Sequence, residues 1–338
     1  MIRAAPLALL TLAAPVWAET GHRILSVEVA HRDVGLDVRL WYPAAPGAEP
    51  EWIGRTALFH GHRVRPDAPA ATEDPLPLVL LSHGSGGNAV AMGWLAGELA
   101  EQGMIVAAPN HPGTTSGDSV PALTVRPWER AWDTTALLDH LLASPPGGLA
   151  TDPDAIAAVG SSLGGHTALR LVGARVSKDA FVAYCDGNDV LDCGWFAEAG
   201  LDLGSIDARL YEASDRDGRI AVAVAVDPAL AQASVPESLA GIDAPLLVVN
   251  LGAGGAVPEG VAGGPIAAAA PNGRHRAIEG AVHFSVLARC RPLGRIVIGL
   301  AEDEPICADP VRPRAEVHEE LTALIGDFLR AALPPPAR

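Results

Sequence analysis

The segment Gly160-Ser161-Ser162-Leu163-Gly164 separates two stretches of different character. Before it, residues 155–159 (Ala-Ile-Ala-Ala-Val) predict a short buried strand, and after it residues 165–172 predict the start of a helix. A G-x-S-x-G pattern on such a turn exposes the serine hydroxyl, because the glycines let strand and helix approach closely. The helix N-terminus favours the negative charge that develops on an attacked carbonyl group. We therefore predict that Ser162 is a nucleophile, the alternative being a plain turn.

Length and composition predict an enzyme-sized α/β domain. The chain has 338 residues, of which 49% are hydrophobic, and this is enough for one large core. Its 36 Gly and 29 Pro residues indicate many loops. The net charge of −16 argues against a basic surface for nucleic acid or for anionic membranes.

The N-terminal residues have the pattern of a secretory signal peptide. Arg3 precedes the apolar run 4–16, and Val16-Trp17-Ala18 has small residues where a signal peptidase would cut. This predicts a signal peptide over residues 1–18, one mature domain over 19–338, and a secreted or periplasmic location. The alternative is a buried N-terminal helix. The run is too short to span a bilayer and no later segment is better suited, so we predict no transmembrane segment.

The four cysteines all lie in the mature part and fit an oxidising compartment. Four cysteines allow three connectivities. Sequential pairing, Cys185 with Cys193 and Cys290 with Cys307, is the simplest, because each pair brackets a loop-like stretch. The spacings of cysteine and histidine do not suggest a metal site, and no cofactor is expected.

Downstream of residue 19 the pattern alternates between strands and helices and shows no internal repeat, which predicts one doubly wound α/β domain. Residues 252–273, rich in Gly, Ala and Pro, predict a mobile loop. The predicted strands are 24–29, 36–42, 78–81, 104–108, 155–159, 220–226, 245–249 and 274–278, and the predicted helices are 88–101, 129–142, 165–172 and 317–333.

A serine nucleophile on this type of fold is followed along the chain by its acid and then by its histidine. Three histidines lie far enough downstream. His275 falls inside a predicted strand, and His318 falls on the predicted exposed side of the last helix. His283 follows the last predicted strand in a glycine-containing loop, from which it could reach the serine. We therefore predict His283 as the base.

Two carboxylates compete for the role of the acid. Asp227 directly follows the predicted strand 220–226, at the end of the strand where α/β sites gather. The next strand ends in Asn250, which carries no charge, and the first acid beyond it is Glu259 in the glycine-rich stretch. A flexible glutamate would orient the histidine poorly, so Asp227 is favoured over Glu259. The alternative for Asp227 is a helix N-cap without a catalytic role.

The oxyanion hole requires two backbone N–H groups. One is expected from Leu163, the residue after the nucleophile, and the other from Ser85 in the turn His83-Gly84-Ser85-Gly86-Gly87. The alternative for this turn is a simple loop. His83 is expected to make structural hydrogen bonds rather than to act as a second base.

Together these motifs resemble α/β-hydrolases of the dienelactone-hydrolase-like group, which includes the plasma-type platelet-activating-factor acetylhydrolases. The resemblance implies a mostly parallel central sheet flanked by helices, a Ser162-Asp227-His283 triad, and a pattern after the histidine to which Cys290 and Cys307 belong. Dienelactone hydrolases use a cysteine nucleophile where this chain has Ser162, which argues against dienelactone as the substrate. The matching segments are Leu81–Gly87, Ala107–Gly113, Gly160–Gly165, Val226–Ala229 and Ala281–Phe284.

Ser162 and Asp227 are 65 residues apart in the sequence, whereas a helix, a turn and a strand need roughly 25–30. The surplus, residues 175–218, contains Cys185 and Cys193 together with several aromatic residues. We predict that it forms a small cap over the site and supplies apolar substrate contacts. The alternative is a surface excursion held by a disulfide.

These expectations combine into a serine carboxylic-ester hydrolase that acts on short- to medium-chain esters through an acyl-enzyme. The expected partner is a small-molecule ester, with no nucleic acid, and no pattern specifies an oligomeric state. The alternatives are a lipid or polyester hydrolase, a peptidase, or a non-catalytic binding protein on the same fold.

Overall fold

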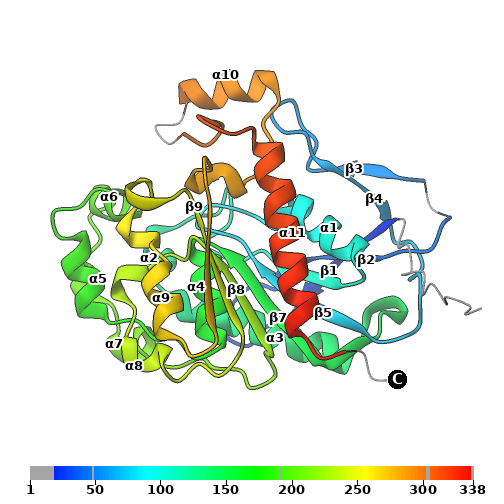
Figure 1. Ribbon diagram of the computed structural model, residues 1–338, viewed down its shortest axis with the longest axis horizontal. Coiled ribbons are helices and arrows are strands. Elements are labelled where there is room, and N and C mark those ends of the chain that lie inside the picture. The colour runs from blue at the N-terminus through cyan, green and yellow to red at the C-terminus, as the bar shows by residue number, and fades with distance from the viewer. Residues whose placement is uncertain (1–18, 48, 191, 302–304, 336–338) are drawn as a thin grey trace, which may run out of the picture.

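A computed structural model describes residues 19–47, 49–190, 192–301 and 305–335 of the chain (Figure 1). The predicted signal peptide, residues 1–18, lies outside the described residues. One sheet runs through the domain in the strand order β10-β9-β8-β7-β5-β6-β2-β1-β4-β3. Its strands are β1 (Thr20–Val27), β2 (Leu36–Pro43), β3 (Glu51–Ile53), β4 (His62–Pro66), β5 (Leu76–Ser82), β6 (Ile105–Pro109), β7 (Thr151–Ser161), β8 (Val222–Val226), β9 (Leu246–Leu251) and β10 (Gly273–Ile278).

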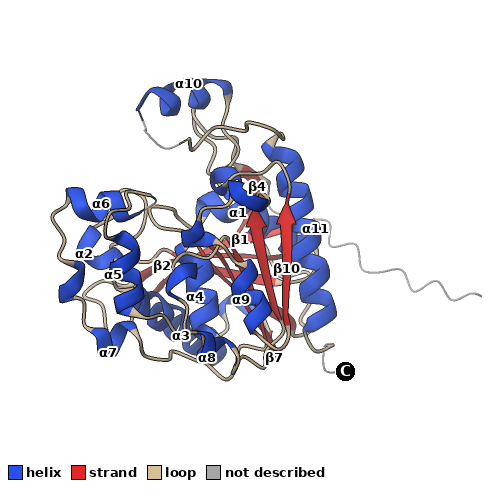
Figure 2. Cartoon of the chain, turned by 60° about the vertical axis from the view of Figure 1, so that its left-hand side comes forward, coloured by secondary structure: helices blue, strands red, loops and turns tan. Residues whose placement is uncertain are grey.

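The neighbouring strands β10, β9, β8, β7, β5 and β6 pair in parallel. Strand β2 pairs antiparallel with both β1 and β6. Helices cover both faces of this sheet (Figure 2). They are α1 (Gly93–Glu101), α2 (Pro121–Thr124), α3 (Pro127–Ala143), α4 (Leu163–Leu171), α5 (Lys178–Cys185), α6 (Asp192–Glu198), α7 (Ala208–Tyr211), α8 (Pro236–Leu239), α9 (Gly264–Ala269), α10 (Pro292–Ala301) and α11 (Arg314–Ala332).

The central strands are apolar at nearly every position because both faces of the sheet are covered. In β8, Ala223 and Ala225 point into the core that contains α3, α4 and α9, while the alternating valines point into the core that contains α1 and α11. The small alanines leave room for α4, which packs closely on β7 and β8. The structure confirms the predicted fold class.

Residues 175–218 form a separate layer of short helices, α5, α6 and α7, at one end of the domain (Figure 2). A small apolar cluster joins this layer to α3, with Phe181, Phe196 and Tyr211 on one side and Trp128 on the other. The cluster is separate from the two large cores that enclose the sheet.

The prediction of a loop over residues 252–273 is wrong for part of that stretch. The stretch contains two 3₁₀ turns and helix α9, and Val261 and Ile266 are fully buried. Its glycines and alanines allow the chain to pack tightly against β9 and β10: a Cβ on Gly263 would lie 2.2 Å from Val248 Cγ1. Composition alone suggested a flexible segment, but these small residues serve close packing. Among the described helices, none is long and apolar enough to cross a bilayer.

Candidate active site

Ser162 occupies a strained turn between β7 and α4. Its φ is 52° and its ψ is −122°, a conformation that a non-glycine residue adopts at a cost of about 1–3 kcal/mol. A Cβ on Gly160 would lie 2.2 Å from the Gly164 carbonyl oxygen, and one on Gly164 would lie 2.0 Å from the Ser82 carbonyl oxygen. Both glycines are therefore required for the close approach that exposes the Ser162 side chain. The Ser162 N–H donates to the Val226 carbonyl at 2.9 Å, which joins the turn to β8.

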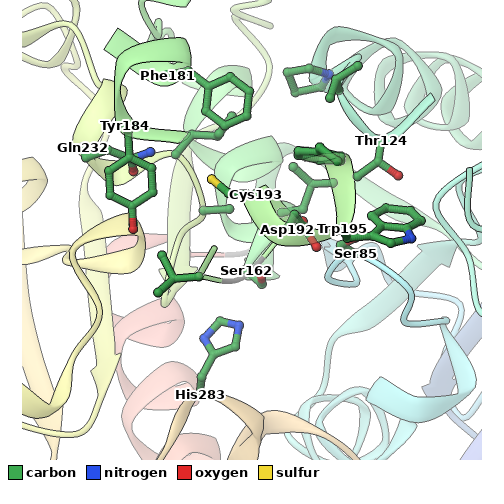
Figure 3. Close-up of a pocket in the computed structure, with 18 of the residues that line it drawn as sticks. Ser85, Thr124, Ser162, Phe181, Tyr184, Asp192, Cys193, Trp195, Gln232 and His283 are labelled. Carbon is green, nitrogen blue, oxygen red and sulfur yellow. The ribbon is translucent and has the colours of Figure 1, made fainter. Parts of the chain in front are cut away.

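Asp227 and His283 form a hydrogen-bonded pair. Asp227 follows β8, is 1% exposed, and accepts from His283 Nδ1 through Oδ2 at 3.0 Å. Because a carboxylate can only accept, the Nδ1 atom of His283 carries the hydrogen, and this leaves Nε2 as an acceptor. Ser162 and His283 line the same pocket, and the imidazole ring points toward Ser162 (Figure 3).

Asn250 holds the carboxylate of Asp227. Its Nδ2 donates to Asp227 Oδ1 at 2.8 Å and to the Val261 carbonyl at 2.7 Å. Asp227 Oδ1 also accepts from the Leu251 N–H at 2.9 Å. Strand β9 runs two residues further than predicted, and the pairing of Val226 with Val249 places the two polar residues next to each other. That register is the signal that could have identified Asn250.

Glu259, the alternative acid, is exposed at the start of a 3₁₀ turn. His275 lies in β10, as predicted, and its Nε2 bonds Asn250 Oδ1 at 2.9 Å. The structure therefore brings Asp227, and not Glu259, to His283.

Two aromatic side chains, His318 and Trp94, donate hydrogen bonds to the backbone of the loop that carries His283. His318 Nε2 donates to the carbonyls of Ser285 at 2.9 Å and Leu287 at 3.1 Å, and Trp94 Nε1 donates to the Val286 carbonyl at 3.0 Å. The Trp94 and His318 rings stack with their centroids 3.5 Å apart. Three successive carbonyls after His283 are therefore fixed.

The prediction that His318 is exposed is wrong. It is 6% exposed, because Trp94 of α1 covers this side of α11. Burial lowers the pKa of His318 to about 3, so the ring stays neutral near neutral pH. The apolar stripe of an isolated helix does not show that another helix covers its polar side.

Leu163 and Ser85, the predicted oxyanion donors, lie beside Ser162 in the pocket. Leu163 opens α4, where the first N–H groups of a helix have no acceptor within it. The neighbouring turn must come close, since a Cβ on Gly84 would lie 3.1 Å from Ser162 Cβ. This arrangement can direct two backbone N–H groups at one oxygen atom.

Arg130 of α3 fixes the turn before Ser85 and was not anticipated from the sequence. It is 1% exposed and donates to Ser82 Oγ at 3.2 Å, to Thr114 Oγ1 at 2.6 Å and to the His83 carbonyl. Burial lowers the pKa of Arg130 to about 9, which still leaves the guanidinium charged at neutral pH. The available signal was an arginine at a position that helical spacing aligns with the buried Leu137 and Leu141.

His83 is buried, and both of its ring nitrogens bond within the protein. Nδ1 donates to the Gly84 carbonyl at 2.7 Å, and Nε2 accepts from the His111 N–H at 3.3 Å. These contacts fit the structural role expected of His83.

A cavity of about 290 Å³ opens above Ser162 and His283 (Figure 3). The sheet side contributes Ser85, Leu163 and Gln232. The opposite wall comes from residues 175–218, which contribute Phe181, Tyr184, Val190, Asp192, Cys193, Trp195, Phe196 and Tyr211.

Both disulfides of the structure join the predicted pairs. Cys185–Cys193 links α5 to α6, and Cys193 lines the cavity. Cys290–Cys307 closes the segment that carries α10, and Ile306 beside it also lines the cavity. In the described ranges, no cluster of His, Cys, Asp or Glu is arranged to hold a metal ion.

Several solved structures that superimpose on this chain are hydrolases. A ferulic acid esterase from Streptomyces cinnamoneus superimposes with a TM-score of 0.61 at 21% identity, covering 97% of this chain and 94% of the esterase. The chain has the α/β-hydrolase fold. A dienelactone hydrolase from Anabaena variabilis gives 0.52 at 15% identity, covering 94% of this chain and all of the other, in agreement with the dienelactone-hydrolase-like form expected from the motifs.

A dienelactone-hydrolase-like promiscuous phosphotriesterase from metagenomic libraries, P91, gives a TM-score of 0.54 at 12% identity, covering 94% of this chain and all of P91. No protein-family model matches the chain, and comparison with curated proteins found no similar sequence. At these identities the neighbours establish the fold, and function has to be argued from the site.

Proposed function

We propose that this protein is a serine hydrolase that cleaves carboxylic esters through an acyl-enzyme. One observation carries the proposal: His283 bonds Asp227 at 3.0 Å and shares a pocket with Ser162, which stands on a strained strand-to-helix turn. A base oriented by a buried carboxylate and facing a strained serine is the arrangement that nucleophilic catalysis requires.

In the first half-reaction, Ser162 Oγ attacks the ester carbonyl carbon while His283 Nε2 takes the hydroxyl proton. The N–H groups of Leu163 and Ser85 bind the oxyanion of the tetrahedral intermediate. As the intermediate collapses, the bond to the alcohol oxygen breaks and His283 returns the proton to that oxygen. Asp227 stays ionised throughout and stabilises the imidazolium.

In the second half-reaction, water replaces the alcohol. His283 takes a proton from the water as its oxygen attacks the acyl carbon, and then gives that proton back to Ser162 Oγ as the ester bond to the serine breaks. The carboxylic acid leaves and the free serine is restored. These steps need no cofactor.

The expected substrates are uncharged esters of small to medium size. The cavity is near the lower end of the range for ligand pockets, about 300–1,000 Å³. Its described lining contains no Arg or Lys but does contain the Asp192 carboxylate, which disfavours anionic esters. The wall formed by residues 175–218 supports their role as a cap. A lipid or polyester hydrolase, or a peptidase, is the second candidate, because the same fold occurs in a puromycin-hydrolyzing peptidase from Mycobacterium tuberculosis.

Removal of the nucleophile tests the proposal. Ser162→Ala should lower kcat on 4-nitrophenyl acetate by about 10⁴-fold or more, since triad members act as a unit. A fluorophosphonate probe should label the wild type but not this variant. Ser161→Ala is the matched control. The Ser161 hydroxyl is next to Ser162 in the sequence but is buried against the Met92 sulfur, so its loss should leave kcat and labelling unchanged. Equal labelling of Ser162→Ala and the wild type would refute the assignment.

We also propose that the protein is exported, with residues 1–18 removed as a signal peptide. Two disulfides in the structure support this, because they persist in oxidising compartments. N-terminal sequencing of the exported protein should give Glu19 as the first residue. A retained Met1 would contradict the proposal.

A further inference from the structure

Two buried polar atoms of residues that line the cavity make no hydrogen bond to any described part of the protein. Tyr211 is 1% exposed, and its Oη makes no hydrogen bond within the described part of the chain. Gln232 Oε1 is also buried and likewise makes no hydrogen bond to the described residues. Both residues line the cavity that holds Ser162. A buried polar group without a partner is costly, and such groups are rare in folded proteins. Their shared cavity indicates that a ligand supplies the missing hydrogen bonds.

The wall of this cavity is much richer in aromatic residues than the chain as a whole. Three of the five Phe and two of the three Tyr residues of the protein line it, although aromatic residues make up only 4% of the sequence. Phe181 stacks on Tyr211 with the ring centroids 5.8 Å apart, and Trp195 lies 5.7 Å from Phe196. Flat aromatic walls bind another aromatic ring by stacking or edge-to-face contact.

We propose that this cavity binds a hydroxylated aromatic ring, which the ester carries in either its acyl or its alcohol part. The proposal rests on the ester-hydrolase function proposed above and names its substrate class. The ring packs among the aromatic side chains. Its hydroxyl donates to Gln232 Oε1 and accepts from Tyr211 Oη. Burial raises the pKa of Tyr211, so this side chain stays a neutral hydrogen-bond donor.

Other ligand classes match the wall less well. An alkyl chain leaves both polar atoms unpaired. An aryl carboxylate faces the Asp192 carboxylate and meets no Arg or Lys on the described wall. A sugar brings more hydroxyl groups than this mostly apolar wall can pair.

Two pairs of esters test the proposal and separate the acyl from the alcohol position. The acyl pair is methyl 3-(4-hydroxyphenyl)propanoate and methyl 3-phenylpropanoate. The alcohol pair is 2-(4-hydroxyphenyl)ethyl acetate and 2-phenylethyl acetate. In one of the two pairs, the hydroxyl should raise kcat/KM roughly tenfold, the factor expected for one or two net hydrogen bonds. Equal rates in both pairs would overturn the proposal.

Variants localise the effect. Tyr211→Phe removes only the phenolic hydroxyl, and Gln232→Leu removes only the amide. Each variant should lower the preference for the hydroxylated ester roughly threefold, because the other hydrogen bond remains. The matched control is Tyr42→Phe, because the Tyr42 hydroxyl is buried elsewhere and donates to the Ala68 carbonyl at 2.7 Å. It should retain the preference. A preference that is undiminished in both pocket variants would also overturn the proposal.

Direct binding keeps this inference separate from the enzymatic proposal. By calorimetry on the Ser162→Ala protein, 2-(4-hydroxyphenyl)ethanol should bind roughly tenfold more tightly than 2-phenylethanol. If no ester is cleaved but this difference in affinity appears and Tyr211→Phe lowers it, the ligand class stands and the ester-hydrolase function fails. If esters are cleaved with Ser162 dependence but neither the rates nor the binding respond to the hydroxyl, the ligand class fails and the function stands.

Discussion

The sheet edge and the layer of residues 175–218 face each other across one cavity, and they are held in different ways. On the sheet side, Ser162 and Asp227 both have positive φ values and stand at the ends of parallel strands. Buried hydrogen bonds from Asn250 and His318 fix their surroundings. The groups proposed for chemistry are thus fixed by backbone geometry, which preorganises a reaction site.

As far as the structure describes it, the facing layer contributes no strand to the sheet. It consists of short helices around a small aromatic cluster, and one disulfide closes it. A buried ion pair links it to the sheet side: Arg170 of α4 pairs with Asp215 and donates to the Tyr211 carbonyl at 2.7 Å. We infer that chemistry is fixed on the sheet, while selectivity depends on a layer whose side chains can change without disturbing the sheet.

The largest change in kcat is expected on the sheet side, from substitution of Asp227, the proposed acid of the triad. Asp227→Asn should lower kcat by roughly 10⁴-fold, because the amide leaves His283 in the wrong tautomer. Glu259→Gln is the control for the exposed rival and should change kcat little. Steady-state kinetics on 4-nitrophenyl butyrate measures both. The opposite ranking would move the acid to the later loop.

The attachment of the facing layer is tested at Arg170. Arg170→Met should lower the free energy of unfolding by about 3–5 kcal/mol, because Asp215 keeps only its hydrogen bond from Trp132 and loses the cation, and because several carbonyls lose their donor. Arg209→Met in the same layer removes an exposed pair with Asp207 and should change nothing measurable. Urea unfolding compares the two variants. Equal midpoints would show that the buried pair does not hold the layer.

Between pH 6.5 and 4, acid should act on the sheet region through its buried histidine His62, whereas residues 175–218 contain no histidine. Burial lowers the pKa of His62 from 6.5 to about 4, and its Nε2 accepts from Trp41 Nε1 at 3.0 Å. The unfolded chain therefore binds more protons between these values, and stability falls as pH drops from 6.5 to 4. The shift corresponds to about 3 kcal/mol. In thermal unfolding between pH 6.5 and 4, the melting temperature of His62→Gln should fall less steeply with falling pH than that of the wild type. An unchanged slope would exclude His62 as a contributor.

The smallest effect concerns the depth of the cavity. Each methylene that fits should contribute about 0.8 kcal/mol, so activity should rise from acetyl to about butyryl or hexanoyl esters and then fall. No jump in rate is expected above the solubility limit of the substrate. A series of 4-nitrophenyl esters gives the optimum, which Trp195→Ala should move to longer chains. A preference for palmitoyl esters would mean that residues 175–218 do not limit the site.

The sequence by itself determined the elements whose signals are local. The turn at Ser162 follows from two glycines around one serine between a strand pattern and a helix pattern. His283 follows from its place in a glycine-containing loop after the last strand, and the disulfides follow from short cysteine spacings. Such features depend on neighbours along the chain, so a pattern of residue types is enough to predict them.

Only the tertiary structure decided which distant side chains meet. Asn250 supports Asp227 because the register of β8 against β9 aligns the two strand ends. His318 is buried because α1 places Trp94 on it. The Tyr211 hydroxyl makes no hydrogen bond to the described residues, and only the three-dimensional structure places it in the wall of the cavity. Burial and hydrogen bonding between elements depend on packing in three dimensions, and the spacing of residues along a single chain does not contain that information.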